Sequence, residues 1–565
     1  MDESDGSGPE EAHDGKDAKE QDKLLALAGL SSTELAACIY VLRRLHEAHE
    51  AGILEAHASC LRPLRKVLSL HLRRTFGHLP QKDALEENER KRAEKERKRE
   101  RRQRQLEADR RFRENAQLRA SRMAKLQALE KDEEPGAHGQ LRIPDGPVED
   151  QAVEGAEPGA FSGSEYCRQQ SCYICKVRFS ERHHFYSHLC PPCASLNFAK
   201  RHNERNLAGR TCLVTGARVK IGFQVATKLL RMGARVLATT RFPQDAQKRY
   251  AAEPDSDQWL GRLQIIGADF RFLAGVEAMC AELCNREVCL DVIVNNACQT
   301  VRRPAAYYAH LLTTESPSYH YPSLEMSEAS ASSLDARQLT SSGSAALSQL
   351  LVVEQDGMKA EKALAALPPG ARDVHGQQLD LRSTNSWLLK LGEVETPEAV
   401  EVFCINAMAP FIINSRLRPL MERASQPDRY IINVSAMEGK FYRYKQPTHP
   451  HTNMAKAALN MMTRTSAEEL ASNGIYMNSV DTGWINDENP LPLAQRIAED
   501  HQFQTPIDEI DAAARILDPV LTGMEAIASG GGNSHRSRKS GSAGGSHAAG
   551  PPWGIFLKDY KQTEW

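Results

Sequence analysis

The clearest hydrophobic pattern in the chain begins near residue 210, where short apolar runs alternate with amphipathic stretches. Residues 212–214 form an apolar run that predicts a buried strand. The run ends at Gly216, and apolar residues then recur at helical spacing: Ile221, Val225, Ala226, Leu229 and Leu230. A strand, a glycine turn and a helix N-terminus bring backbone N–H groups and the positive end of the helix dipole together, where they can bind a pyrophosphate. Taken alone, the pattern fits an ordinary strand-turn-helix unit equally well.

Further apolar runs predict more strands of the same kind. They cover residues 234–240, 263–269, 290–294 and 430–434, and residues 553–557 predict a final strand. The second of these strands ends in Thr239, Thr240 and Arg241. An NAD-selective site carries an acidic residue here for the ribose 2′-hydroxyl, whereas Arg241, with Arg218 in the turn, suits a 2′-phosphate. We therefore expect NADP(H) rather than NAD(H), the alternative being that both arginines are surface residues near the cofactor.

The N-terminal third has a different composition. Residues 1–22 are acidic and poor in large apolar groups, which predicts disorder. Residues 23–80 predict a helical hairpin, with one helix from Ser32 and a second around residues 64–72. Residues 81–132 lack a sustained apolar seam, which favours a charged, solvated helix over a coiled coil. Residues 133–165, rich in Gly, Pro, Asp and Glu, predict a linker.

Overall charge and composition narrow the function classes. The formal net charge is −2, so no global attraction to nucleic acid or membranes follows. The basic stretch 90–104 suits a nuclear address or a polyanion contact, but the glutamates within it favour a plain solvated helix. There is no run of about 18 apolar residues and no secretory signal, so we expect a cytoplasmic protein without a membrane span.

The cysteines predict a metal site. Five of the 13 cysteines lie close together, and four of them form two Cys-x-x-Cys pairs, Cys172 with Cys175 and Cys190 with Cys193. Four thiolates at this spacing are typical of a closed structural zinc site. His183, His184 and His188 lie between the pairs and could replace one thiolate, although such histidines usually only pack nearby. We expect a zinc-ribbon-like segment over residues 166–205 that docks the N-terminal arm without taking part in catalysis.

Several motifs occur together after residue 209, and the chain resembles the short-chain dehydrogenase/reductase family. They are Thr215-Gly216 with Ile221-Gly222, Asp269, Asn295-Asn296-Ala297, Asn406, Ser435, Lys456 and Asp481-Thr482-Gly483. The resemblance implies a doubly wound parallel α/β (Rossmann) sheet over residues 206–565, with an insertion at 299–400 and a low-complexity loop at 529–550. The stretches 299–303, 433–439, 449–456 and 556–559 also resemble a subgroup in which zinc knuckles precede the reductase domain.

The resemblance implies a cofactor site and a catalytic set. The cofactor residues are those of the motifs and their neighbours: Thr215, Gly216, Arg218, Lys220, Ile221, Gly222, Arg241, Asp269, Phe270, Asn295, Asn296, Ala297, Lys456, Thr482 and Gly483. Ser435 would polarise a carbonyl, Lys456 would hold the nicotinamide ribose, and Asn406 would support a proton relay. The implied function is NAD(P)-dependent oxidoreduction of a small carbonyl or alcohol, in a protein that can form homo-oligomers.

The sequence departs from the family at the catalytic tyrosine. Four residues before Lys456 stands Thr452, whose hydroxyl cannot replace a phenol as a proton donor near neutral pH. His451 is the predicted substitute, because an imidazole titrates near neutrality, and His449, Tyr442 and Tyr444 are alternatives. The rival interpretation is a catalytically inactive dinucleotide-binding scaffold or sensor. Lys220 also replaces a usual glycine, and can either supply charge to the pyrophosphate or weaken the site.

Overall fold

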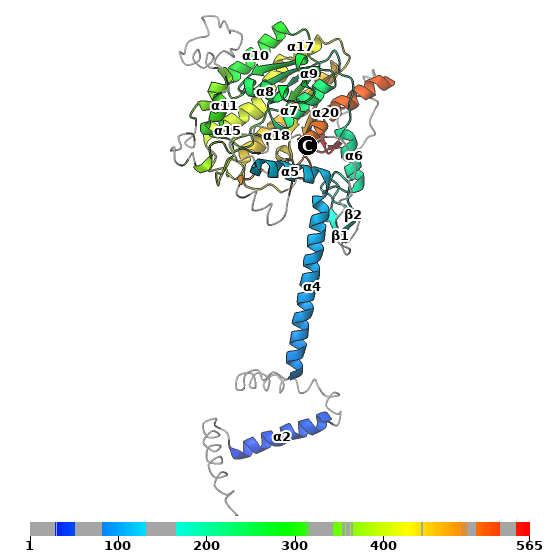
Figure 1. The fold of residues 1–565 in the computed structure, drawn as a ribbon, viewed down its shortest axis with the longest axis vertical. Coiled ribbons are helices and arrows are strands. Elements are labelled where there is room, and N and C mark those ends of the chain that lie inside the picture. Colours follow the sequence, from blue (N-terminus) through cyan, green and yellow to red (C-terminus); the bar gives the residue numbers. More distant parts are fainter. Residues whose placement is uncertain are drawn as a thin grey trace, which may run out of the picture. The chain divides into compact units, whose positions relative to one another are not determined.

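The structure, a computed structural model, describes ten ranges of the chain and a few isolated positions between them (Figure 1). The ranges are residues 31–50, 82–131, 165–313, 343–352, 365–373, 375–441, 444–485, 488–491, 504–531 and 550–565. The chain divides into two compact units, residues 1–102 and 103–565. In the first unit, helix α2 (Ser32–Glu50) confirms the helix predicted from Ser32. The acidic tail, the second helix of the predicted hairpin and the linker up to residue 164 lie outside the described residues.

The charged segment 81–132 forms two helices rather than the single one predicted. They are α4 (Lys82–Glu114) and α5 (Gln117–Lys131), separated by Asn115 and Ala116. Residues 89–104 are exposed, as predicted for a solvated helix, but Ala116 and Leu118 are buried. Leu118 packs among the apolar side chains of the segment that follows, and Phe112 meets the Tyr166 ring edge-on at 5.0 Å. The break in the helix therefore lies where the arm docks on its neighbour.

An eight-stranded sheet forms the centre of the second unit. Its order is β10-β9-β8-β7-β6-β3-β4-β5, and every neighbouring pair is parallel except β9 with β10. The strands are β3 (Thr211–Val214), β4 (Arg235–Thr240), β5 (Leu263–Gly267), β6 (Val292–Asn295), β7 (Arg429–Ser435), β8 (Ile475–Asp481), β9 (Phe556–Lys558) and β10 (Lys561–Thr563). The chain moves outward from β3 to β5 and then returns to β6, so the topology switches between β3 and β6.

Helices cover both faces of this sheet, which confirms the doubly wound α/β fold (Figure 1). Strand β3 shows why, since Cys212 and Val214 pack in one apolar cluster and Leu213 in the other. One cluster holds α7 (Lys220–Arg231), α8 (Pro243–Ala251) and α20 (Glu509–Ala526). The other holds α10 (Leu273–Arg286), α16 (Ala409–Arg416) and α18 (Pro450–Ser472). The strands are short and continuously apolar because both of their faces are buried.

The cysteine segment, residues 165–205, docks on the N-terminal half of α20. It contains the hairpin β1 (Glu165–Ser171) and β2 (Arg178–Glu181), followed by α6 (Pro191–Arg201). The Arg201 guanidinium donates two hydrogen bonds, of 2.6 and 2.9 Å, to the carboxylate of Asp508, which caps α20. The Tyr186 hydroxyl donates to Asp511 over 2.5 Å, and Arg515 donates to Asn197 over 2.7 Å. All these groups are buried, and these hydrogen bonds join the cysteine segment to α20 and its cap.

Described parts of the insertion 299–400 fold back onto the carboxyl ends of the strands. Residues 305–312 form the short helices η3 (Ala305–Tyr308) and α11 (Ala309–Leu312). The Tyr308 ring stacks on Phe242, which follows β4, with centroids 5.5 Å apart. The Trp387 ring stacks on His449 at 3.8 Å. Both flanks of the insertion therefore contribute to the edge of the sheet at which parallel strands present their binding sites.

One segment is apolar and long enough to pass a length-and-composition test for a membrane span. It is Thr396–Arg416, which comprises α15 (Thr396–Phe403), the π-helix η7 (Cys404–Met408) and α16. Half of its apolar window is buried inside the fold, and Ile412 and Ile413 belong to the core beneath the sheet. A buried core helix passes the same test, so this segment is weak evidence for a membrane span.

We expect Asp508→Ala to destabilise the protein by about 3 kcal/mol or more, because it removes the cap of α20 and leaves buried Arg201 without its main partner. The matched control is Glu469→Ala, which breaks an ion pair of 2.6 Å with Arg418 on the surface and should cost about 1 kcal/mol or less. Urea unfolding of both variants and the wild type measures the difference. Equal costs for the two substitutions would show that the docking of the cysteine segment does not depend on the buried pair.

Candidate active site

A cavity of about 700 Å³ lies at the carboxyl ends of the parallel strands. Its walls come from the turn after β3, the ends of β4, β6, β7 and β8, the insertion and the cysteine segment. Open α/β sheets bind ligands at this edge, where the strand order reverses. Most of the predicted cofactor residues lie in its wall: Gly216, Arg218, Lys220, Ile221, Gly222, Arg241, Asp269, Phe270, Asn296, Ala297, Lys456, Thr482 and Gly483.

The glycine turn leaves no room for side chains at two positions. Gly216 has a φ of +67°, and a Cβ added there would lie 2.8 Å from the Cα of Ala297. A Cβ on Gly222 would lie 2.3 Å from the carbonyl oxygen of Gly216. The Asn296 side chain donates to that same oxygen over 3.2 Å and to the Thr215 oxygen over 3.0 Å. The turn is therefore held open as a cradle of backbone, as binding of a pyrophosphate requires.

The backbone conformation of Lys220 shows why a glycine is usual at this position. It begins α7 with a φ of +54°, in the left-handed region that favours glycine. This position needs a positive φ, which a glycine adopts without strain. Lys220 adopts it with some backbone strain. In return, its ammonium lies in the wall of the cavity beside the cradle.

The two arginines predicted to bind a 2′-phosphate, Arg218 and Arg241, have different partners within the protein. The Arg218 guanidinium donates to Asp245 over 2.7 Å and to Gln377 over 2.5 Å, so its charge is already compensated. Arg241 lies over the Tyr308 ring, 4.4 Å from its centroid, and lines the cavity. The sequence could not distinguish them, because the partners of Arg218 lie 27 and 159 residues away along the chain.

Asp269 and Phe270 lie in the cavity wall at the end of β5, as predicted. Burial alone would raise the pKa of Asp269, but the hydrogen bonds and charge of Arg271 hold it below its usual value. The shortest of these bonds, to Arg271, is 2.7 Å. Asp269 is therefore an ionised acceptor with a fixed orientation.

Three of the predicted residues act from behind the wall, since the described residues that line the cavity do not include them. Thr215 accepts hydrogen bonds from the backbone of Asn296 and Ala297 through its hydroxyl, at 2.9 and 3.0 Å. The buried Asn295 side chain donates to Asn414 and Asn433, each over 2.8 Å. These contacts hold β3, β6 and β7 in place, and contact of Thr215 and Asn295 with the cofactor stays a prediction.

Asn406, the predicted relay residue, is the third. Its side chain lies in the π-helix η7 and pairs with both backbone groups of Gln299, accepting at 2.8 Å and donating at 3.1 Å. Within the described part of the chain, no hydrogen bond joins Asn406 to Lys456. In this structure Asn406 orders the segment after β6, and its role in a relay stays a prediction.

Ser435 and Lys456 meet in the cavity although 21 residues separate them. Ser435 ends β7 and donates to the Asn460 side chain over 2.7 Å. The buried Lys456 ammonium donates to the carbonyl of Val434 over 2.7 Å. Thr452, one helical turn before Lys456, also lines the cavity. Its hydroxyl is 2 % exposed and has no hydrogen-bond partner within the described residues.

His451, the predicted proton donor, is not among the described residues that line this cavity, and its role as a donor stays a prediction. Helix α18 begins at Pro450, and one residue along a helix rotates a side chain by about 100°. Thr452 and Lys456 therefore share the cavity face, while His451 turns toward Glu398 of α15, with Nε2 3.8 Å from Oε1. Among the alternatives, Tyr444 is 87 % exposed, His449 stacks beneath Trp387, and Tyr442 lies outside the described residues.

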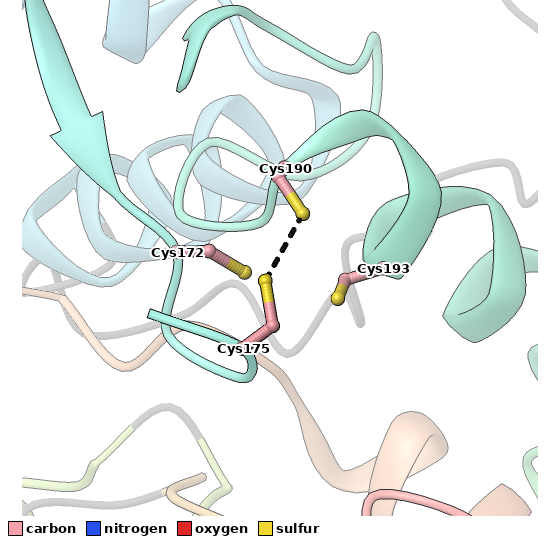
Figure 2. Close-up of side chains that lie close together, drawn as sticks. All are labelled: Cys172, Cys175, Cys190 and Cys193. Carbon is pink, nitrogen blue, oxygen red and sulfur yellow. Dashed lines mark hydrogen bonds between the residues drawn. The ribbon is translucent and has the colours of Figure 1, made fainter. Parts of the chain in front are cut away.

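The four predicted cysteine ligands come together (Figure 2). Cys172 and Cys175 lie in the turn after β1, and Cys190 and Cys193 at the start of α6. The sulfur atoms lie within 4.8 Å of one another, close to the spacing of about 3.8 Å that four bonds of about 2.3 Å to a tetrahedral metal produce. A hydrogen bond from the backbone of Val177 lowers the pKa of Cys175 to about 7. The cluster therefore fits a metal ion held by thiolates.

The three histidines between the cysteine pairs pack nearby instead of joining the cluster. His183 and His184 stack on each other at 4.1 Å, and both lie against Phe198. His188 pairs with the Ser187 hydroxyl at 2.9 Å. Burial lowers the pKa of His183 to about 4 and that of His188 to about 3. His183 and His188 are therefore neutral at physiological pH and pack within the segment.

The cavity wall contains residues that sequence reasoning did not assign to a site, among them Tyr173, Arg303 and Lys558. Lys558 pairs with Asp481 over 2.6 Å, and Arg303 pairs with Asp380. Both lie in the stretches 299–303 and 556–559, which had already been singled out as signatures. Tyr173 carried no such signal, because it stands between two predicted metal ligands, far from the sheet in sequence.

Known proteins with similar sequences agree with this architecture. Residues 210–311 match the family model for short chain dehydrogenases, and residues 388–520 match the model for enoyl-(acyl carrier protein) reductases. The chain belongs to the short-chain dehydrogenase/reductase family. It is therefore a member of a family of oxidoreductases, and the resemblance inferred from its motifs is confirmed.

Individual relatives share different parts of the chain. An uncharacterized protein of Acanthamoeba polyphaga mimivirus is 32% identical over 366 residues, which cover 62% of this chain and 71% of that protein. Mouse retinol dehydrogenase 14 is 36% identical over 100 residues, covering 16% of this chain and 29% of its own length. Human dehydrogenase/reductase SDR family member 13 is 35% identical over 109 residues, covering 19% and 26%. The match to these two enzymes spans less than a third of their length.

Two solved structures that match this chain have low sequence identity to it. A short-chain dehydrogenase from Streptomyces avermitilis is 18% identical, with a TM-score of 0.34, over 56% of this chain and 84% of its own. The RhlG/NADP active-site complex of Pseudomonas aeruginosa is 20% identical, also with a TM-score of 0.34, over 55% and 90%.

Folding stability should depend on pH through His451. Burial, with a smaller contribution from His449, lowers its pKa to about 4, against about 6.5 in an unfolded chain. Between these values the unfolded state binds the extra proton, so stability falls as the pH is lowered from about 6.5 to about 4. In His451→Gln, denaturant titrations across this window should show a slope smaller by up to about 1.4 kcal/mol per pH unit. His202→Gln, at an exposed site, is the control, and an unchanged slope in His451→Gln would contradict the prediction.

Proposed function

We propose that this protein is an NADP(H)-dependent oxidoreductase that acts on a carbonyl or alcohol group of a small molecule. One observation supports it above all: the glycine cradle, Arg241, Ser435 and Lys456, from four separate parts of the chain, line one cavity. The cavity has the groups needed at both ends, backbone N–H groups for a pyrophosphate and a Ser–Lys pair for the reacting end. The NADP complex of the Pseudomonas aeruginosa relative is consistent with this cofactor class.

Each residue has a defined part in this proposal. The backbone around Gly216 and Gly222 would hold the pyrophosphate, with Lys220 adding charge, and Arg241 would bind the 2′-phosphate. Lys456 would hold the nicotinamide ribose, and Ser435 would donate a hydrogen bond to the substrate oxygen. When bound, the dinucleotide supplies or accepts the hydride. The residues of the chain orient the two partners and stabilise the charge on the oxygen.

Thr452 would act as a second donor to the substrate oxygen. A buried hydroxyl without a partner among the described residues is costly unless a ligand or water satisfies it, and Thr452 is one of the residues that line the cavity. Thr452 stands where the family has a tyrosine, so it points to the reacting oxygen from the same helical face. Its hydroxyl keeps its proton at neutral pH, so it contributes a hydrogen bond rather than a titrating acid.

The cysteine cluster would hold zinc in a closed, structural site. Four thiolates leave no open coordination position, which separates this site from a catalytic one. The two hairpin strands and α6 that supply the ligands form a small core with α5 and the N-terminus of α20. The metal would therefore hold together the segment that joins the N-terminal arm to the sheet.

A binding protein without turnover is the second candidate. The observation that favours it is the catalytic set itself, because Ser435 already donates to Asn460 and Thr452 replaces the phenol. This candidate requires that NADPH binds but that no carbonyl substrate oxidises it. Loss of the near-ultraviolet absorbance of NADPH in the presence of any substrate would exclude it.

A fluorescence titration of the full chain with NADPH and with NADH tests the cofactor assignment. We expect NADPH to bind more tightly, and Arg241→Ala to weaken its binding by about 10- to 100-fold while NADH binding changes little, because only NADPH has the 2′-phosphate. Lys248→Ala, an exposed lysine on α8, is the control for loss of a nearby positive charge. Equal weakening for both dinucleotides would show that Arg241 does not read the 2′-phosphate.

Substitutions in the catalytic set test the reaction. Lys456→Ala and Ser435→Ala should each reduce turnover by about 100-fold or more, and Thr452→Val should do so by about 10- to 100-fold, with partial recovery in Thr452→Ser. The controls are Ser472→Ala, at the exposed end of α18, and NADPH binding by Ser435→Ala, which should persist. Activity that survives both Lys456→Ala and Ser435→Ala would overturn the proposed roles.

A further inference from the structure

Tyr173 links the cysteine cluster to the wall of the proposed dinucleotide site. It stands between the ligands Cys172 and Cys175, and its backbone N–H donates to the carbonyl of His188 over 2.9 Å. Its ring reaches the cavity, where its hydroxyl accepts a hydrogen bond of 2.9 Å from the backbone N–H of Trp484. A residue of the cysteine turn is thus part of the cavity that the sheet forms.

The contact falls at a place where the chain has little freedom. Gly483 has a φ of +82°, and a Cβ there would lie 2.7 Å from Ile507 and 3.5 Å from the Tyr173 hydroxyl. The backbone N–H of Gly483 donates to Asp481 over 2.9 Å, and Asp481 also pairs with Lys558. The turn after β8 is therefore held by two hydrogen bonds, one from Trp484 to the Tyr173 hydroxyl and one from Gly483 to Asp481.

Helix α5 and the cysteine segment also bind the residues just before α20. The Arg122 guanidinium of α5 donates to the carbonyls of Thr505 and Ile507 over 2.5 and 2.7 Å. Ile485 and Ile507 are buried in the apolar cluster that contains Cys172 and Cys190. Arg201 then binds Asp508, the cap of α20. The residues that follow β8 and those that precede α20 thus share one small core with the cysteines.

Residues on this stretch face the cavity. Thr482, Gly483, Trp484 and Ile485 all line it beside Lys558. Besides the contacts from the cysteine segment and from α5, described contacts that tie this wall to the sheet run through Asp481 and Lys558. Four thiols brought together in a turn keep that geometry only when a metal holds them, since the metal-free site lacks the bonds that define it.

We infer that the metal-loaded cysteine segment positions this wall of the dinucleotide site through Tyr173, so that loss of the metal weakens dinucleotide binding. The inference rests on the proposed function, since it concerns the same cavity. Tyr173 is a positioning residue that acts through Trp484 and Gly483. Because coupling between two sites is reciprocal, bound NADPH also tightens binding of the metal.

The test compares two Tyr→Phe variants of the full chain, each of which removes one hydroxyl from the same segment. Tyr173→Phe loses the bond to Trp484 at the cavity, whereas Tyr166→Phe loses a buried bond of 2.9 Å to the carbonyl of Ser187, away from it. With zinc bound to both, Tyr173→Phe should raise the Kd and the KM for NADPH by about threefold to tenfold, the range for one hydrogen bond. Tyr166→Phe should bind NADPH as the wild type does, and kcat should change less than KM in Tyr173→Phe.

A second measurement does not depend on any variant. Stripping zinc from the wild type with a chelator should weaken NADPH binding by at least the same factor, and saturating NADPH should lower the equilibrium fraction of zinc that a competing colorimetric chelator takes up. Hydrogen exchange should speed up in the peptides that contain Trp484 and Ile507 when the metal is removed.

Distinct results separate this inference from the proposed function. A wild type that binds neither NADPH nor NADH overturns the proposed function and this inference with it. Tight NADPH binding that is unchanged by Tyr173→Phe and by removal of zinc leaves the proposed function intact and overturns the inference alone.

Discussion

The structure depends on one close approach, that of helix α7 to the turn after β3. The first turn of α7 packs so closely on the preceding turn that a Cβ on Gly222 would collide with the carbonyl of Gly216. This approach opens the end of α7 toward the cavity and sets the position of Asn296, whose side chain closes the turn on the β6 side. The dinucleotide cradle is thus the place where the packing of the core and the shape of the site meet, and a bulkier residue would disturb both.

Buried charges hold the cysteine segment to this framework. Arg201, Asp508 and Asp511 are each removed from water, so their attraction offsets desolvation only while all of them remain in place. Such a cluster contributes little net stability compared with an apolar core of the same size, but it allows one arrangement of α6 on α20. That arrangement carries Tyr173 to the cavity, so the turn that holds Cys172 and Cys175 contributes a residue to the cavity wall.

The face of α18 that lines the cavity carries Thr452 where the family has a tyrosine, and it retains Lys456. Lys456 is anchored to Val434, Ser435 to Asn460, and the position one turn before Lys456 still faces the cavity. A buried hydroxyl at that position, without a partner among the described residues, fits hydrogen bonding to a ligand better than it fits a role in the core. Ser435, Thr452 and Lys456 therefore line the same cavity, while the phenol is absent from the position one turn before Lys456.

The amino-acid sequence alone determined the parallel strands, the glycine turn and the grouping of the four cysteines. These features are local, since buried strands are continuous apolar runs and metal ligands keep short spacings. Other features depend on which side chains meet across the chain, and only the tertiary structure decided them. Arg218 is compensated by Asp245 and Gln377, and His451 lies one residue, about 100° of helix, away from the cavity face. Tyr173 reaches Trp484 across 311 residues, a contact that no local spacing predicts because it depends on how separate elements pack.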